Sequence, residues 1–463
     1  MESARGEPDR SRIFLGWWVV AGLFVVNMTT SGFGFYAQAP FIRALVKEQN
    51  FSTGLTGLAT GLFFMTSGIT GYLTSGLIGR IDVRKMMCAG AVIAGLALVL
   101  IGNVETVPQM FGANILFGIG FSLCGLVPST TVVTRWFARK RSVALSISST
   151  GLSVGGILLA PSVAALVNKH GMAQVTPWLG LAWAAVVIPV TILFVKSWPA
   201  DHGLYADGAD APLAGAAPIG GWSYLEARVT RYFILLTAAY VFVMLAQVGG
   251  LAHQTKMVSD RFGDNLGNLV VSVTAGASVI GRLAGGLVVL RFPPKKLTLA
   301  LMAVQGVALF GLAAASNKQA ILGFCVVFGL SVGNLLMLHP LLLADAFGVK
   351  EYSKIYGLSQ LMMTTGVGLG PAVVGFVRDA WSYRVAFGLA GVSSIVALAL
   401  YSASGVLGLQ PPKVITLEKD PALSRRIYWT TLGGNVMKSS SKCSYLGRCN
   451  NFSVTALSYS LLA

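Results

Sequence analysis

The sequence predicts an all-α membrane protein of twelve transmembrane helices in two pseudo-symmetric six-helix bundles, and three observations support this prediction. The chain of 463 residues is 54% hydrophobic and only 11% charged, with a mean hydropathy of +0.71. An ordinary soluble domain carries about 25% charged residues. The apolar residues are gathered in stretches of about 20, the length that a helix needs to cross a bilayer. Related motifs also recur in the two halves of the chain.

Twelve stretches are long and apolar enough to span a membrane. They are residues 16–38, 54–78, 86–103, 109–133, 143–166, 177–196, 231–253, 267–290, 297–315, 320–344, 355–377 and 384–404. The first is too long for the core of a signal peptide. The predicted organisation is an N-terminal segment, a first bundle, a linker, a second bundle and a tail expected to be disordered, at 1–15, 16–196, 197–230, 231–404 and 405–463.

Motifs in the first six stretches recur in the last six. Thr150-Gly151 with Gly155 in the fifth stretch returns 215 residues later as Thr365-Gly366 with Gly370. Phe117-Gly118 with Pro128 returns 211–212 residues later as Phe328-Gly329 with Pro340. Small residues at this spacing let helices approach closely, so we interpret the glycines as packing positions. Duplicated bundles with a site between them are a common plan of secondary transporters.

The basic residues predict the orientation. The net charge is +17. With the N-terminus inside, the inner segments carry 25 of the 34 Lys and Arg residues and the outer loops carry 8, as the positive-inside rule requires. We therefore expect a protein of the plasma (inner) membrane with both termini in the cytoplasm. The basic charge is explained by membrane topology and lipid contact, so we expect no nucleic-acid partner. We also expect the protein to function as a monomer.

The sequence contains no motif of an enzyme. It has no P-loop, no G-x-S-x-G and no H-E-x-x-H. The five cysteines form no C-x-x-C pair or Cys/His cluster, so we expect neither a metal nor a cofactor. Without a nucleotide site, the energy for transport would come from a gradient.

Several motifs resemble the major facilitator superfamily, and within it the bacterial branch related to monocarboxylate and oxalate/formate transporters. The resemblance runs from about residue 12 to 404. The motifs are Gly16-Trp17-Trp18-Val19-Val20-Ala21, Arg135-Trp136-Phe137-Ala138-Arg139-Lys140-Arg141, His253 with Ser259-Asp260-Arg261, and Gly281-Arg282-Leu283-Ala284-Gly285-Gly286. The resemblance implies a twelve-helix carrier fold and a transport function.

The loop between the second and third stretches departs from the pattern of the superfamily. That pattern usually reads G-x-L-x-D-R-x-G-R-K, and its acidic residue belongs to a charge network that biases the conformational cycle. Here Gly79 stands in place of the aspartate, and Asp82 stands in place of the glycine. The resemblance therefore implies a conformational-switch loop in which Asp82 could supply one half of the network. Its members are Gly76, Arg80, Asp82, Arg84 and Lys85.

Apart from Lys196, Arg231 and Arg384, which are end residues of their stretches, Arg282 is the only full charge inside the twelve stretches. An intramembrane arginine costs about 2.5 to 3.5 kcal/mol on insertion scales, so it normally faces a wet cavity or a partner. Its planar fork fits a carboxylate, and in the resembled branch the arginine of the eighth span anchors the substrate anion. The alternative is an arginine that snorkels to the inner interface.

No Asp or Glu lies inside any stretch, which argues against a proton-coupled exporter of cations. Where eukaryotic monocarboxylate carriers have an aspartate, one turn before the arginine, this chain has Ser278. Two histidines remain as titratable candidates. His253 could gate, bind substrate or take a proton, or be an interfacial histidine with a hydrogen bond. For His339, next to Pro340, we expect a structural hydrogen bond.

Polar residues on the stretches are candidates to line the substrate path. Helix-to-helix hydrogen bonding is an equally good interpretation of each. They are Asn27, Tyr36, Gln38, Asn114, Tyr240, Gln247, Asn334 and Gln360. The sequence thus predicts a secondary transporter of a small organic anion, most closely a monocarboxylate, working by proton symport or anion exchange. The alternatives are an exporter of neutral or amphipathic compounds on the same fold, and a non-transporting membrane sensor.

Overall fold

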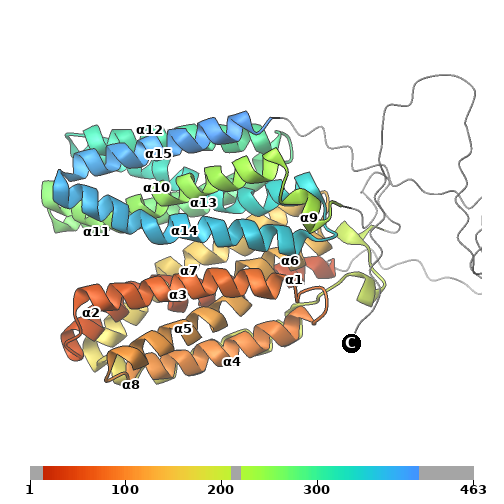
Figure 1. The fold of residues 1–463 in the computed structure, drawn as a ribbon, viewed down its shortest axis with the longest axis horizontal. Coiled ribbons are helices and arrows are strands. Elements are labelled where there is room, and N and C mark those ends of the chain that lie inside the picture. Colours follow the sequence, from red (N-terminus) through yellow and green to blue (C-terminus); the bar gives the residue numbers. More distant parts are fainter. Residues whose placement is uncertain (1–13, 210–220, 406–463) are drawn as a thin grey trace, which may run out of the picture. The chain divides into compact units, whose positions relative to one another are not determined.

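The computed structural model describes residues 14–209 and 221–405, and these residues fold almost entirely into helices that run side by side (Figure 1). The predicted N-terminal segment and tail, 1–15 and 405–463, lie almost wholly outside the described residues. All described residues belong to a single compact unit.

The first half of the chain supplies helices up to residue 194. They are α1 (Leu15–Thr30), η1 (Ser31–Tyr36), α2 (Gln38–Glu48), α3 (Thr53–Ser75), α4 (Val83–Gly102), α5 (Val107–Cys124), α6 (Leu126–Trp136), α7 (Arg141–His170) and α8 (Met172–Phe194). The segment that follows, the linker, contains η2 (Ala200–His202), η3 (Ala206–Gly208) and α9 (Tyr224–Ala227).

The second half supplies six long helices. They are α10 (Arg231–Phe262), α11 (Asp264–Val288), α12 (Pro294–Ala314), α13 (Lys318–Phe347), α14 (Tyr352–Ala380) and α15 (Tyr383–Ala403). Several begin at the residues that favour helix starts: the side chains of Thr230, Asn317 and Ser382 each accept a hydrogen bond from a backbone N–H in the first turn.

The predicted spans correspond to these helices. Eleven helical segments of the described chain are long and apolar enough to cross a membrane. The second predicted span, α3, is long enough at 23 residues and carries no charge, but it is rich in Thr and Gly and is not among these eleven. It packs against α5 of its own bundle and against α14 of the other bundle. The twelve-helix membrane fold is therefore confirmed, and the protein is an integral multi-pass membrane protein.

Two spans are less regular than the sequence predicts. The predicted continuous span 109–133 is interrupted at Gly125, whose extended backbone (φ −79°, ψ −153°) ends α5 and starts α6. The first span contains a π-helical turn, η1. Turns of this kind occur frequently at functional sites, and this one ends at a predicted substrate residue, Tyr36.

The repeated glycines pack helices together as predicted, and they do so at corresponding places in both halves. On α7, a Cβ at Gly151 would overlap the Phe24 carbonyl oxygen of α1. On α14, 215 residues later, a Cβ at Gly366 would overlap the Val241 carbonyl oxygen of α10. Each pair of helices crosses too closely for any side chain, so the duplication seen in the sequence is a duplication of a helix crossing.

This crossing gives a test with a matched control on one helix. We expect Gly366→Ala to lower stability by about 1–3 kcal/mol, the usual range for overpacking, seen as a lower melting temperature in detergent. Gly368→Ala should be neutral or mildly stabilising, because no atom lies within 4 Å of the position its Cβ would take and alanine favours helix. Equal melting temperatures for the two variants would contradict the close crossing.

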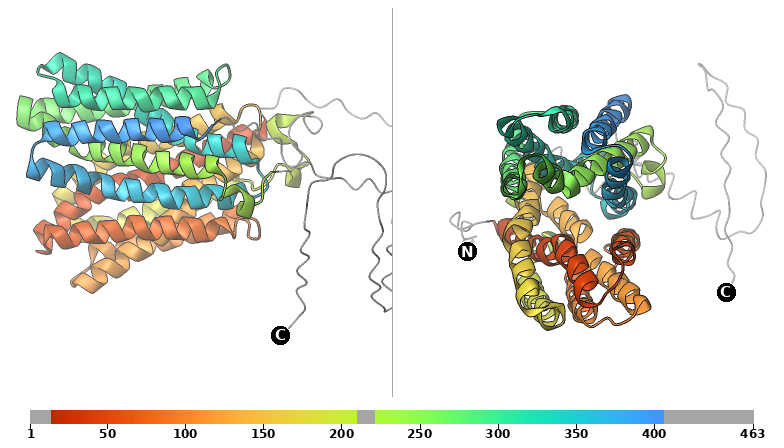
Figure 2. Two further views of the ribbon diagram at one scale, coloured as in Figure 1. Left: turned by 45° about the horizontal axis from the view of Figure 1, so that its top comes forward. Right: turned by 90° about the vertical axis from the view of Figure 1, so that its left-hand side faces the viewer.

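The helices of the two halves form two groups. Figure 2 (right) looks along the helices and shows those of the first half, red to yellow, apart from those of the second half, green to blue. The groups meet where α7 packs on α11 and α13, and where α3 and α6 pack on α14. We call the end of the helices at which α8 finishes and α10 begins the linker end, and the opposite end the far end.

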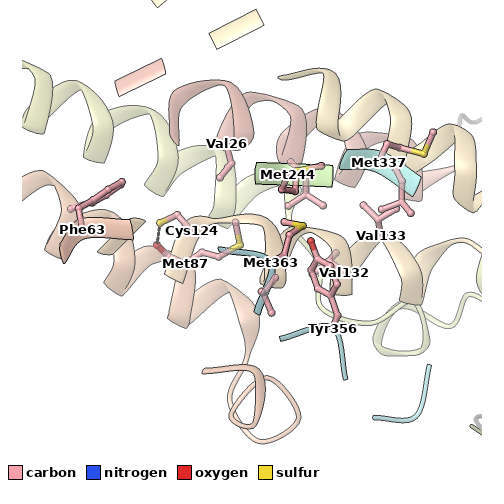
Figure 3. Packing of buried hydrophobic residues seen from close by; sticks show 14 of the residues in the cluster. Val26, Phe63, Met87, Cys124, Val132, Val133, Met244, Met337, Tyr356 and Met363 are labelled. Atoms are coloured by element: carbon pink, nitrogen blue, oxygen red, sulfur yellow. Dashed lines mark hydrogen bonds between the residues drawn. The ribbon is translucent and has the colours of Figure 1, made fainter. Parts of the chain in front are cut away.

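The largest buried cluster draws side chains from both groups. It includes Val132 and Val133 of α6 together with Met337 of α13 and Tyr356 and Met363 of α14. Figure 3 shows these residues within one region of the interior. The two halves thus share an apolar contact toward the linker end, in which the unbranched Met side chains can adapt to small shifts.

Candidate functional site

Arg282 lies between the two halves. Its side chain comes from α11 and is 2% exposed, which excludes an arginine that snorkels to the interface. Nε donates to the Gly333 carbonyl of α13 at 2.8 Å. Nη1 crosses to α7, where it donates to the Ser149 carbonyl at 2.5 Å and to Ser153 Oγ at 3.1 Å.

The hydrogen bonds around Arg282 have a fixed direction. Because a guanidinium can only donate, Ser153 Oγ accepts from it and has its own proton left to give. Ser153 and Ser278 hydroxyls lie 3.0 Å apart, and Ser278 Oγ donates to the Ala275 carbonyl at 2.9 Å. The chain therefore runs from Arg282 through Ser153 and Ser278 to a backbone carbonyl, and every acceptor in it is neutral.

No carboxylate balances this charge. Among the described residues no ion pair involves Arg282, and no hydrogen bond within 14–209 and 221–405 uses its Nη2. A buried charge is normally paired. Arg282 therefore combines an uncompensated positive charge with a free donor, the properties that an anion site needs.

A stripe of four serines on α7 lines its contact with α11, and we call this contact the seam. Three of them contribute hydroxyls and Ser149 contributes its backbone carbonyl. None of the four was a predicted site residue. Ser142 Oγ donates to the Gly286 carbonyl of α11 at 3.0 Å, and Ser146 Oγ donates to the Arg282 carbonyl. Ser149 and Ser153 are the acceptors described above. The spacing of these serines could have predicted them, since 142, 146, 149 and 153 lie on one face of a helix. Serine is common in membrane helices, however, and is a weaker indication of a site than a charged residue.

Tyr36 lies at the same level as this seam. Its ring packs against Gly156, where a Cβ would come within 2.6 Å of the ring, and Gly156 is less than one turn beyond Ser153 on α7. Tyr36 and Arg282 lie within electrostatic range of each other. The structure thus brings together two predicted substrate residues that are 246 positions apart, Tyr36 from η1 and Arg282 from α11.

The other candidates of the first half make structural hydrogen bonds. Asn27 Nδ2 donates to the Ser148 carbonyl of α7 at 3.0 Å. Asn114 Nδ2 donates to Met110 of its own helix at 2.9 Å, and Gln38 Oε1 accepts from Thr60 Oγ1 at 3.4 Å. Asn27 Oδ1 and Gln38 Nε2 are buried without a partner in the described chain, so each still has a polar atom to offer.

The candidates of the second half also combine structural hydrogen bonds with polar atoms that have no partner in the part of the chain that the structure describes. Tyr240 is fully buried and donates to the Leu335 carbonyl at 3.1 Å. Asn334 Nδ2 donates to the Leu330 carbonyl of its own helix at 2.9 Å, and its Oδ1 lies against Gly285, which follows Arg282 by three residues on α11. One oxygen each of Gln247, Asn334 and Gln360 is buried without a partner among the described residues. Buried polar atoms of this kind usually bind water or a ligand.

The two histidines lie in different places. Near the far end, His253 Nε2 is 2.9 Å from the Pro371 carbonyl oxygen, and its ring centroid is 5.9 Å from that of Tyr383. His339 is fully buried in the second half, with Nε2 2.8 Å from Ser359 Oγ. Neither contacts Arg282 in the described structure.

The predicted switch loop is held within the first half. Asp82 begins α4, accepts from Arg84 at 2.8 Å and from Ser197 Oγ of the linker at 2.6 Å. Partial burial raises the pKa of the Asp82 carboxyl, but these hydrogen bonds outweigh it and lower that pKa to about 2. Arg80 and Lys85 are exposed, and Gly76 ends α3. The role of this loop as a conformational switch stays a prediction.

Contacts at the linker end join the halves instead. Arg141 Nη1 of α7 and Asp345 Oδ1 of α13 form an ion pair at 3.0 Å. Linker residue Tyr224 reaches both halves, since its hydroxyl is 2.7 Å from that of Tyr72 of α3 and its N–H donates to Glu351 Oε2 at 2.6 Å. Hydrogen bonds from Lys354 and then from Tyr224 lower the pKa of the Glu351 carboxyl.

The halves separate toward the far end. One face of α3 touches α14 at two levels: Ser75 lies against Gly357, and Gly68 against Leu361 and Thr364. Farther along the same face, no atom lies within 4 Å of the Cβ position at Gly61. On α14 the same is true of Gly368. Between α7 and α11, no hydrogen bond in the described structure lies beyond Ser153 and Ser278. This conformation is therefore closed at the linker end.

The ion pair at the linker end should hold it closed. We expect Arg141→Ala to speed labelling of a buried probe, Ser75→Cys, by a water-soluble thiol reagent two- to fivefold (~0.5–1 kcal/mol), as for a half-exposed pair. The exposed neighbour Arg139 supplies the control, Arg139→Ala, which should leave the rate unchanged. Exchanging the charges, Arg141→Asp with Asp345→Arg, should restore slow labelling. If the labelling rate is the same in the wild type and in all three variants, the ion pair does not hold the linker end closed.

Two surface depressions of the described chain do not include Arg282. Both lie at the far end of the second half, one beside Leu266 and Lys318 and the other between Arg261 and Arg384. They are open depressions at helix ends, so we assign the site from the hydrogen bonds around Arg282. In the described part of the chain no group of three or more His, Cys, Asp or Glu residues could hold a metal ion.

Comparisons with known proteins identify the family of this chain. The sequence model described as Major Facilitator Superfamily matches residues 24–336 and 255–437. Human "Monocarboxylate transporter 11" is 26% identical over 394 residues, covering 81% of this chain and 79% of that protein. "Uncharacterized MFS-type transporter YcxA" of Bacillus subtilis is 25% identical, covering 58% of this chain but only 64% of its own length. "Agnestins efflux protein AgnL12" of Paecilomyces divaricatus is 23% identical, covering 82% and 84%.

Solved structures show the same fold. The transporter FucP in the outward conformation has a TM-score of 0.65 at 16% identity, covering 86% of this chain and 100% of that one. The proton:xylose symporter XylE has a TM-score of 0.64 at 13% identity, covering 84% and 95%. At these identities the likeness concerns the fold alone.

Proposed function

Because this chain belongs to the Major Facilitator Superfamily, a family of transporters and not of enzymes, we propose that it moves a small organic anion, most closely a monocarboxylate, by alternating access. The two bundles would rock about the seam that contains Arg282. The proposal includes a plasma-membrane location with both termini in the cytoplasm, and a working monomer.

The observation that carries this proposal is the unpaired charge of Arg282. Desolvating a guanidinium costs several kcal/mol, and only neutral acceptors face it here. A substrate carboxylate would supply the missing negative charge through a fork of two N–H···O bonds. Serine, tyrosine and amide groups around it would orient the rest of a small substrate.

The same arginine would link binding to movement. Its Nη1 is now given to Ser149 and Ser153 of the opposite half. A carboxylate that takes both Nη1 and Nη2 competes for these bonds and so weakens the seam. Substrate binding would thereby lower the barrier to opening the linker end, as alternating access requires. The transported anion would accompany a proton or exchange for another anion.

Uptake into proteoliposomes tests this function. We expect labelled monocarboxylates such as lactate, pyruvate or butyrate to enter, and their neutral amides not to enter. Repeating the assay with and without a pH gradient, and with a second anion inside the vesicles, separates symport from exchange. If amides enter as well as the acids, the site does not select an anion.

A second candidate is export of amphipathic compounds, supported by the efflux protein among the relatives and by the aromatic surroundings of Tyr36. The ring of Phe35 lies 5.1 Å from Tyr36 and 5.5 Å from Phe64. This function predicts that cells lacking the protein become sensitive to apolar toxins in a drug-susceptibility panel, and that transport survives loss of Arg282.

A further inference from the structure

His339 is a buried titratable group that the proposed transport site does not use. Its side chain is fully buried. Nε2 lies 2.8 Å from Ser359 Oγ, which in turn is 2.8 Å from Thr237 Oγ1. Tyr240 stacks on the imidazole at 4.3 Å between ring centroids, and the ring of Tyr356 lies 5.5 Å away. Nδ1 has no partner in the described chain.

This environment accepts only a neutral imidazole. The ionisable groups that face the ring are tyrosines: Tyr240 from α10 and Tyr356 from α14, with Tyr352 stacked on Tyr356 at 5.6 Å. The nearest acid on α13, Asp345, is six residues away and is paired with Arg141. The acids of α10 and α14, Asp260 and Asp379, lie at the far end. A charged imidazole would therefore be buried unpaired, which is costly.

Tyr356 lies between His339 and α6 of the other half. Tyr356 packs against the ring on one side, and its hydroxyl lies beside Thr130 of α6. Figure 3 shows Tyr356 together with Val132 and Val133 of α6. Helices α6 and α14 contact each other across the two halves. Opening the linker end would move α6 away from α14 and uncover the side of Tyr356 that α6 now contacts. A rotation of the Tyr356 side chain, which the closed form prevents, would then admit water to His339 from the linker side.

We propose that His339 makes closure of the linker end depend on the proton concentration on that side of the membrane. The closed form holds the imidazole neutral, and the open form allows it to bind a proton. Acidification on the linker side then favours the open form, and the carrier closes only after His339 releases its proton. This inference rests on alternating access at the linker end, but not on the identity of the substrate.

The size of the effect follows from linkage. An imidazole in water titrates near pH 6.5, and the open form binds one proton more than the closed form. The open population therefore rises as the pH falls below about 6.5. At pH 5.5 the ratio of open to closed forms should be about tenfold higher than at pH 7.5. Neutral substitutes for His339 should remove this dependence.

Hydrogen–deuterium exchange of the full chain in lipid nanodiscs, without any substrate, tests the proposal. Exchange is measured at pH 5.5 and 7.5 and expressed as protection relative to the intrinsic rate at each pH. In the wild type, we expect peptides covering α6 and the first turns of α14 to lose protection about tenfold at pH 5.5. His339→Gln, which can still bond to Ser359, should show equal protection at both values, and His339→Asn serves if the Gln variant is unstable.

His253→Gln is the matched control, because it removes the other histidine of the second half at the far end, and it should keep the full pH effect. Equal protection of the wild type at both pH values overturns the proposal. So does an acid-induced loss that persists in both His339 variants. Because no transport is measured, failure of the anion-transport assay would leave this result unaffected.

Discussion

Replacing Arg282 by glutamine should abolish transport of carboxylates, lowering kcat/KM for uptake by a factor of a hundred or more. Removing one partner of a buried, hydrogen-bonded charge pair costs about 2–5 kcal/mol, and here the remaining partner would be the substrate anion. Arg282→Lys keeps the charge but loses the fork, so we expect an intermediate loss of about tenfold. Uptake of labelled monocarboxylate into proteoliposomes measures both.

The control for this prediction is Arg291→Gln. Arg291 follows the same helix but is exposed, so its replacement should leave uptake within about twofold of the wild type. If Arg282→Gln transports normally while remaining folded, Arg282 has only the structural role of joining α7, α11 and α13.

The second large effect is expected where the seam between α7 and α11 closes. At Gly286 a Cβ would lie 2.5 Å from Ser146 Cβ and 3.2 Å from the Ser142 carbonyl oxygen, both in the opposite half. A leucine there would act as a wedge that keeps the linker end from closing. We expect Gly286→Leu to reduce uptake by more than about tenfold, because the strain of an overpacked contact costs about 1–3 kcal/mol in the closed form alone.

This variant should fold, since the atoms nearest to Gly286 belong to the other half and can move apart. Labelling of Ser75→Cys should become fast in the Gly286→Leu background. Gly276→Leu on the same helix is the control, because no atom lies within 4 Å of its Cβ position. Slow labelling together with normal uptake in Gly286→Leu would show that the two halves do not close at this point.

The membrane fold could be predicted from the sequence because a bilayer imposes one simple rule. Stretches of about 20 apolar residues become helices, and the helices formed close to the predicted ranges. The glycine repeat was also informative, since a position that a Cβ cannot occupy leaves a mark in the sequence. The break at Gly125 left none, because a glycine inside an apolar stretch is equally compatible with a continuous helix.

The candidate site was less predictable. A charge such as Arg282 stands out because burial makes it expensive. Asn114 and Asn334 look alike in the sequence, yet the first amide bonds only within its own helix while the second also places an oxygen beside Gly285. Which direction a side chain faces depends on tertiary packing, so a helix pattern alone could not separate them. The serine stripe could have been found from its spacing.

The most direct test of the anion site is binding of matched ligand pairs to the purified protein. Isothermal titration should show heat from a transported monocarboxylate in the wild type, none from its neutral amide, and none from either in Arg282→Gln. Equal affinity for the acid and the amide, or unchanged affinity for the acid in Arg282→Gln, would contradict the assignment of Arg282 as the group that binds the substrate carboxylate.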